Sequence, residues 1–83
     1  MASKYQTKLI KEYEKLGYYV IVLSKTNKNG MTDLQCIKNG SSVFIESKEA
    51  NDTLKALQRY RIDELRKFGC EAFCMQDGKG KIY

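Results

Sequence analysis

The apolar positions at the start of the chain repeat with helical spacing. Over residues 4–16 one stripe of a helical wheel collects the larger apolar side chains, Tyr5, Leu9, Tyr13 and Leu16. Ser3 is a suitable N-cap, and Gly17 is a natural residue to end the helix because glycine tolerates a left-handed conformation. The pattern predicts a first helix over residues 4–16 with one face against a core.

The next three segments read as strands. Residues 18–23 form an almost continuous apolar, β-prone run, which is typical of an interior strand covered on both faces. Residues 33–38 and 41–48 flank Asn39-Gly40, the dipeptide preferred in a two-residue type I′ turn. The pattern therefore predicts a strand followed by a β-hairpin.

The last part of the chain predicts a second helix and a final strand. The helix begins with Asp52 or Thr53 as N-cap, runs to about residue 68 and is stopped by Gly69. Residues 71–75 then form a strand, and a connection of this length between strands implies a parallel crossover. The tail from residue 77 is either a turn with a short closing strand or disordered. The order αβββαβ predicts an α/β fold, a mixed four-stranded sheet flanked by helices.

The hairpin register brings charged side chains together. Pairing across Asn39-Gly40 sets Asp33 opposite Glu46, and the two-residue period of a strand puts Lys48 on the same face. A looser four-residue loop would set Asp33 against Lys48 but would keep all three on one face. Two opposed carboxylates about 5 Å apart repel by roughly 3 kcal/mol at an effective dielectric constant of about 20. A hard divalent cation, Mg²⁺ or Mn²⁺, would relieve that repulsion, and an ordinary edge-strand salt bridge to Lys48 is the alternative.

The second helix carries polar residues on its inward face. Its apolar face is expected to consist of Leu54, Leu57, Leu65 and Phe68. Gln58 and Arg61 fall within that face, where polar groups need partners. Gln58 is predicted to lie beside the cation or an attacking water, or else to cap a sheet edge. Arg61 either reaches a phosphate or carboxylate, or extends its side chain along the surface to solvent.

The net charge of +5 and the pI near 9.2 suit a polyanionic partner. A stripe of lysines on the first helix is a candidate set of phosphate contacts, and so are two lysines in the loop before Asp33. These candidate nucleic-acid-binding residues are Lys4, Lys8, Lys11, Lys15, Lys25 and Lys28. The alternative for each group is solvated surface charge.

At 83 residues the chain is expected to form one domain, residues 1–83, with a thin core. The three cysteines are Cys36, Cys70 and Cys74, and they form no CxxC pair. They favour reduced thiols in a cytoplasmic protein. No segment has the length and apolarity of a membrane span or signal peptide, so we expect no membrane partner.

Asp33 followed by Glu46-Ser47-Lys48 resembles the D…ExK signature of the PD-(D/E)xK nuclease superfamily, most closely its VRR-NUC branch. Further matches lie on both sides of the hairpin. They are the turn 29–34, in which Thr32 replaces the usual proline, and the helix pattern of Asp52, Leu54, Gln58, Leu65 and Gly69. The resemblance covers roughly residues 9–75. It implies a restriction-endonuclease-like fold in which the main-chain carbonyl of Ser47 adds a metal ligand and Glu12 joins the metal site. The alternative for Glu12 is an ion pair with Lys8 or Lys15.

Together these observations predict a Mg²⁺- or Mn²⁺-dependent DNA endonuclease. Asp33 and Glu46 would bind the metal, and Lys48 would orient the attacking water. A non-catalytic double-stranded-RNA-binding module with α-β-β-β-α order is the alternative. Ile10 and Tyr60 lie off the core-facing stripes of their helices, and we expect them to support a two-fold homodimer that acts on branched DNA such as four-way junctions.

Overall fold

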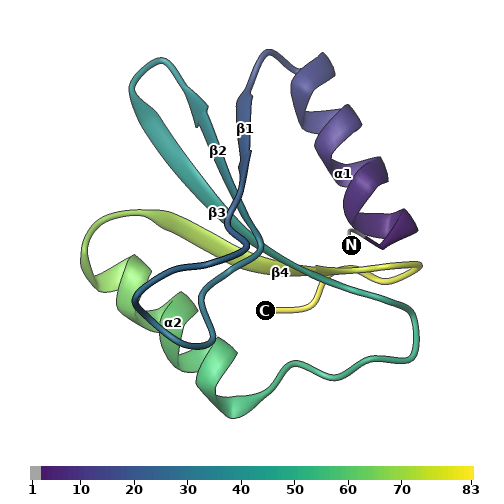
Figure 1. The fold of residues 1–83 in the computed structure, drawn as a ribbon, viewed down its shortest axis with the longest axis vertical. Helices are drawn as coiled ribbons and strands as arrows, with labels where there is room; N and C mark the ends of the chain where they lie inside the picture. The colour runs from purple at the N-terminus through teal and green to yellow at the C-terminus, as the bar shows by residue number, and fades with distance from the viewer. Residues whose placement is uncertain (1–2) are drawn as a thin grey trace.

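The computed structural model describes residues 3–83, so the first two residues of the expected domain lie outside the described part. The fold is a five-stranded mixed sheet with one helix on each face (Figure 1). The elements are α1 (Lys4–Lys15), β1 (Tyr19–Val22), β2 (Leu34–Lys38), β3 (Ser41–Lys48), α2 (Ala56–Lys67), β4 (Glu71–Gln76) and β5 (Gly80–Lys81). The predicted α/β class and the order αβββαβ are confirmed, and the tail adds a short fifth strand.

The strands lie in the sheet in chain order, β1-β2-β3-β4-β5. β1 and β2 are antiparallel, β2 and β3 are antiparallel, and β3 and β4 are parallel, with α2 forming the connection between the last two. An α-β-β-β-α module has no strand after its second helix that could pair in parallel with its third. The parallel β4 therefore argues against the double-stranded-RNA-binding alternative.

The hairpin between β2 and β3 has the predicted turn and register. Asn39 and Gly40 both have positive φ, at 52° and 79°, as a type I′ turn requires. Lys38 pairs with Ser41, and the pairing continues to Leu34 opposite Ile45. The local choice of Asn-Gly thus sets which side chains of β2 and β3 share a face.

Two apolar clusters cover the two faces of the sheet. On one face, Tyr5 and Leu9 of α1 pack against inward side chains of the strands, Leu34, Cys36, Val43, Ile45 and Phe73. On the other face, Ile62 of α2 packs against Ala72 and Cys74 of β4. The first helix begins at Lys4 as predicted and ends at Lys15, one residue before the predicted end, and the Ser3 hydroxyl caps it by accepting from the N–H of Gln6 at 3.0 Å.

Two sequence expectations about exposure are wrong. The apolar run 18–23 was expected to be an interior strand, yet β1 is an edge strand whose Tyr19 and Val22 are exposed, because α2 covers β3 and β4 instead. The apolar face of α2 is also different from the expected one. Ile62 is its buried residue, whereas Leu57 is 45 % exposed and Phe68 is 83 % exposed.

The second helix also begins later than expected, at Ala56 rather than after Asp52 or Thr53. Leu57, near its start, lies against the loop before β2, where a Cβ on Gly30 would meet the Leu57 Cγ at 2.6 Å. Gly30 also has a φ of 77°, so both the space and the backbone conformation require glycine. The start of α2 and the loop before β2 therefore fit closely together.

We predict that Ile62→Ala lowers the free energy of unfolding by about 2–5 kcal/mol, because it empties a fully buried site under the sheet. Phe68→Ala is the matched control on the same helix, and we expect it to cost less than about 0.5 kcal/mol because its ring lies in solvent. Urea denaturation of the two variants and the parent measures both values. Equal losses for the two variants would show that α2 packs with a different face from the one described.

Candidate functional site

A group of polar side chains is buried where β2 and β3 separate under the start of α2. Leu34 and Ile45 point toward α1, so the alternate positions on β3, Glu46 and Lys48, point toward α2. Glu46 is 3 % exposed and Lys48 is 5 % exposed. The predicted sharing of one face by these two residues is confirmed, and it places two charged groups inside the protein.

The two oxygens of Glu46 have different surroundings. Oε2 accepts a hydrogen bond from Nε2 of Gln58 at 3.2 Å and lies 3.6 Å from Nζ of Lys48. Oε1 is buried and has no hydrogen-bond partner within the described residues. Burial raises the pKa of Glu46 to about 7; the negative charge of Asp33 adds to the rise, and Lys48 offsets only part of it.

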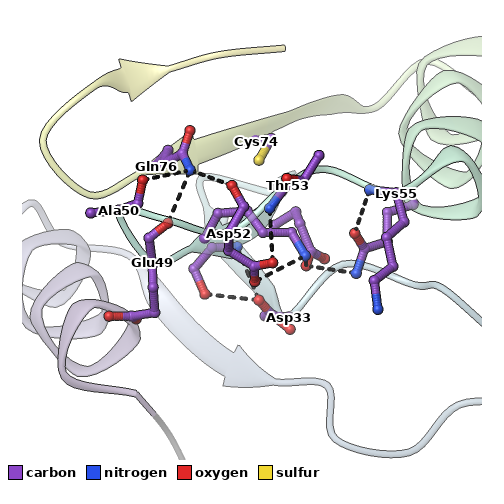
Figure 2. Close-up of polar contacts among 12 residues, drawn as sticks. Asp33, Glu49, Ala50, Asp52, Thr53, Lys55, Cys74 and Gln76 are labelled. Carbon is purple, nitrogen blue, oxygen red and sulfur yellow. Dashed lines mark hydrogen bonds and ion pairs between the residues drawn. The ribbon is translucent and has the colours of Figure 1, made fainter.

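Asp33 is held at the edge of this group by β1 and β3. Its main-chain carbonyl accepts from the N–H of Leu23 at 2.8 Å. Its Oδ2 accepts two hydrogen bonds from Ser47, one from the main-chain N–H at 2.9 Å and one from the hydroxyl at 2.8 Å (Figure 2). Among residues 3–83 no hydrogen bond uses its Oδ1. Ser47 therefore orients Asp33 through its N–H and hydroxyl, a contact that the sequence pattern did not predict.

Lys48 lies between two carboxylates. Its Nζ is 3.6 Å from Oε2 of Glu46 and 3.6 Å from Oδ2 of Asp52. The main-chain N–H of Thr53, which donates to Oδ1, and the charge of Lys48 lower the pKa of Asp52. Lys48 does form a salt bridge, as the alternative interpretation expected, but the bridge to Glu46 is buried rather than at a solvated edge. Asp52 was expected to cap α2, and its contact with Lys48 was missed because nothing in the local sequence indicates it.

Gln58 connects this group to the start of α2. Its Oε1 accepts from the main-chain N–H of Lys55, the N-cap residue, at 3.0 Å, as the third residue of a capping box does. Because the oxygen is engaged there, the amide nitrogen faces Glu46. The inward direction predicted for Gln58 is confirmed, and its contact with Glu46 is direct.

Glu12 is not part of this group. Helix α1 packs against the opposite cluster from α2, and Glu12 lies 4.0 Å from Lys8 on the same helix with both side chains largely exposed. The structure thus places Glu12 in the ion pair with Lys8 and not beside Asp33 and Glu46.

The candidate phosphate-binding lysines lie in two separate places. The four lysines of α1, Lys4, Lys8, Lys11 and Lys15, line one shallow hollow of about 400 Å³. Lys25 and Lys28 line another hollow of about 460 Å³ that also includes Asp33. Arg61 fixes the loop that carries the second pair, since its Nε donates to the carbonyl of Asn29 at 2.8 Å. Lys25 and Lys28 therefore share a hollow with Asp33, whereas the hollow of the α1 lysines includes neither Asp33 nor Glu46.

The donor set suits a hard divalent cation. Asp33 and Glu46 each offer a carboxylate oxygen without a partner among residues 3–83, and the Glu46 oxygen is buried, where an unpaired acceptor is costly. Within residues 3–83 no group of three or more His, Cys, Asp or Glu side chains is arranged to hold a metal ion by itself. One or two carboxylates completed by main-chain oxygen and water are the usual protein ligands of Mg²⁺. The residues present fit such an ion.

Comparisons with solved structures find the same fold in known proteins. No protein-family model matches the chain, and no curated protein matches it. Among solved structures, a VRR_NUC domain is similar with a TM-score of 0.71 and 28 % sequence identity, covering 83 % of this chain and 76 % of that one. Hjc, a Holliday junction resolvase from the archaeal hyperthermophile Archaeoglobus fulgidus, has the same fold with a TM-score of 0.67 and 20 % identity. That match covers 89 % of this chain and 65 % of that one.

Both of these proteins belong to the PD-(D/E)xK nuclease superfamily. The resemblance noted in the sequence is therefore confirmed, and with it the restriction-endonuclease-like fold. The comparisons support the interpretation that this chain is a nuclease.

We predict that the stability of the metal-free protein falls as the pH rises from 5 to 8. The folded pKa of Glu46, about 7, lies above its usual value of 4.5, so the folded state holds a proton that the unfolded state releases first. This single group should contribute roughly 2–3 kcal/mol at pH 5 and almost nothing at pH 8. Urea denaturation in EDTA at the two pH values measures the change.

Glu46→Gln is the control for this prediction, because the amide keeps the shape of the side chain and cannot ionise. We expect the stability difference between pH 5 and pH 8 to shrink by most of that amount in the variant, and the variant to be more stable than the parent at pH 8. An unchanged pH dependence would mean that Glu46 is not the group that destabilises the protein at high pH.

Proposed function

We propose that this chain, which shares the fold of PD-(D/E)xK nucleases, is a metal-dependent DNA endonuclease formed by a single domain, residues 1–83. The observation that carries the proposal is the buried Oε1 of Glu46, which has no hydrogen-bond partner in the described part of the chain and lies near a second carboxylate. A protein gains nothing in stability from such an arrangement, because burial and like charge both oppose the ionised form. A bound cation supplies the missing interaction.

Asp33 and Glu46 are the proposed metal ligands, with the main-chain carbonyl of Ser47 as a third, and the metal is Mg²⁺ or Mn²⁺. The ion would lower the pKa of a nearby water and stabilise negative charge that develops on a phosphate. Ser47 prepares the site for it, because its two hydrogen bonds to Oδ2 of Asp33 leave Oδ1 available. These contacts support ligation by Asp33 without a change of its side-chain direction.

Lys48 and Gln58 are proposed to act on the attacking water. The ammonium of Lys48 lies 3.6 Å from the Glu46 carboxylate, close enough to donate a hydrogen bond to a water or phosphate oxygen at the same site. Gln58 holds the Oε2 of Glu46 by a hydrogen bond whose direction the helix cap determines. Glu46 can then present its other oxygen in one orientation.

DNA is the proposed substrate, contacted through the two lysine groups. Lys25 and Lys28 share a hollow with Asp33, so a phosphate beside them would lie near the carboxylates. The lysines of α1 lie on the other side of the sheet and would contact a different part of the DNA. Two separate basic surfaces support selection of branched DNA such as four-way junctions over a simple duplex.

The cellular setting that we propose is the cytoplasm. Cys36 and Cys74 are buried free thiols whose pKa burial raises to about 11, which keeps them protonated and unreactive. Unpaired cysteines of this kind are typical of reducing compartments. No helix of the described residues has the length and apolarity needed to cross a membrane.

We predict that Asp33→Asn, Glu46→Gln and Lys48→Ala each abolish cleavage and leave DNA binding within about three-fold of the parent, because they remove chemistry and few phosphate contacts. Gln58→Ala should keep measurable cleavage at a rate reduced by about ten- to hundred-fold. The assay uses labelled linear, nicked, flapped and four-way DNA in Mg²⁺ and in Mn²⁺.

Gln35→Met is the matched control, since Gln35 lies on β2 and, among residues 3–83, its side chain bonds to Ser42 alone. It should cleave like the parent. If the parent binds DNA yet cuts none of the four substrates in either metal, the chain is a binding domain with a nuclease fold. That outcome contradicts the proposal.

We also propose a two-fold homodimer. Tyr60 is exposed on α2, as expected, whereas Ile10 packs partly against the core and contributes less exposed apolar surface than expected. The exposed side chains of Leu16, Tyr19 and Val22 add apolar surface at the edge of the sheet. We predict a mass near twice 9.6 kDa in sedimentation equilibrium at micromolar concentration. A mass near 9.6 kDa would remove the dimer and leave the proposed chemistry unaffected.

A further inference from the structure

Gln76, the last residue of β4, lies under the turn that leaves the buried site. β3 and β4 are parallel, and Gln76 pairs with Lys48 in their register. The chain departs from the sheet after Lys48 and passes over the Gln76 side chain, which is 4 % exposed. Gln76 is therefore a buried polar group next to the site but on a different strand from its charged residues.

The amide of Gln76 contacts three main-chain carbonyls of this turn. Its Nε2 is 2.9 Å from the oxygen of Glu49, 3.3 Å from that of Ala50 and 2.7 Å from that of Asp52 (Figure 2). Carbonyls only accept hydrogen bonds, so the NH₂ end of the amide must face them, and its two hydrogens are shared among three acceptors. A buried side chain that donates to residues 49, 50 and 52 determines the path of the turn.

The turn also places the carboxylate of Asp52. Within the turn the main-chain N–H of Asp52 donates to the carbonyl of Glu49 at 3.0 Å, and Gln76 ties the turn to the sheet. Asp52 then directs Oδ1 to the N–H of Thr53 at 2.8 Å and leaves Oδ2 at 3.6 Å from Nζ of Lys48. The distance between Asp52 and Lys48 thus depends on the contacts that Gln76 makes.

This distance matters because Lys48 has two anionic neighbours. Glu46 is one of them, but its charge would be engaged by a cation held beside it. Asp52 is then the remaining carboxylate that holds the ammonium of Lys48 in one orientation. We infer that Gln76 is a positioning residue, which acts through Asp52 to hold Lys48 at the reaction site. The inference rests on the proposed nuclease function.

A double-mutant cycle of Gln76→Met and Asp52→Asn tests the inference. Methionine has nearly the shape of glutamine but cannot donate, and asparagine keeps the shape of aspartate without its charge. We expect each single variant to lose about ten- to hundred-fold in kcat with KM within about three-fold of the parent, and the double variant to be no slower than the worse single variant. Gln35→Met, which replaces a glutamine on β2 away from the turn, should keep the parent's kcat. If the two losses multiply in the double variant, the two residues act independently and the inference is wrong.

A second measurement does not depend on cleavage. The ¹⁵N NMR signal of the Lys48 side-chain ammonium, recorded in EDTA, reports its surroundings directly. We expect Gln76→Met and Asp52→Asn to shift this signal in the same direction and Gln35→Met to leave it in place. A Lys48 signal that moves in Asp52→Asn but not in Gln76→Met overturns the inference even if the parent cuts no DNA.

Gln76→Asn, whose amide is one methylene too short to reach the turn, replaces Gln76→Met if that variant does not fold. The same two readouts apply to it, with the same expected shift and loss. A parent that shows the expected NMR shifts but cleaves no substrate separates the two ideas: the positioning by Gln76 then stands, and the nuclease proposal fails.

Discussion

The burial of the Glu46 carboxylate is the constraint on which the rest of the site depends. A carboxylate that is 3 % exposed must be paired, protonated or bound to a cation, because its charge is otherwise unfavourable in the interior. Lys48 and Gln58 supply contacts to one oxygen only, and Asp33 brings a second negative charge close by. The protein thus holds an incompletely satisfied anionic group in place, and the packing around it must provide the stability that this group does not.

That packing comes from the central position of β3. β2 pairs with residues 41–45 on one side, β4 pairs with residues 43–48 on the other, and a separate apolar cluster covers each face of the sheet. The polar group occupies the end of β3 where β2 has already separated from it, and the turn after Lys48 closes over it. Three of its residues are held by contacts outside the group. Asp33 is held by β1 and Ser47, Gln58 by the cap of α2, and Asp52 by Gln76.

What could be predicted from the sequence is what local chemistry determines. Asn39-Gly40 permits the φ > 0 turn and the turn sets the register of β2 and β3, while the two-residue period of β3 places Glu46 and Lys48 on one face, so this part of the site follows from a few residues. The edge position of β1, the late start of α2 and the exposure of Phe68 do not follow, because they depend on which strands α2 covers. Asp52 and Gln76 were missed for a related reason. Asp52 contacts a lysine on a strand, and Gln76 contacts three carbonyls far along the chain. For Gln76, the alternation of Ala72, Cys74 and Gln76 on β4 already indicates that the side chain points inward.

The central claim is that Asp33 and Glu46 together hold a divalent cation, and a titration with Mn²⁺ followed by electron paramagnetic resonance tests it most directly. The free ion gives a strong signal that weakens when the ion binds, so the measurement needs neither DNA nor cleavage. The account predicts saturable binding to the parent, loss of that binding in Asp33→Asn and in Glu46→Gln, and retention in Gln35→Met. Binding to the parent that survives both carboxylate substitutions, or no binding at millimolar Mn²⁺, would contradict it.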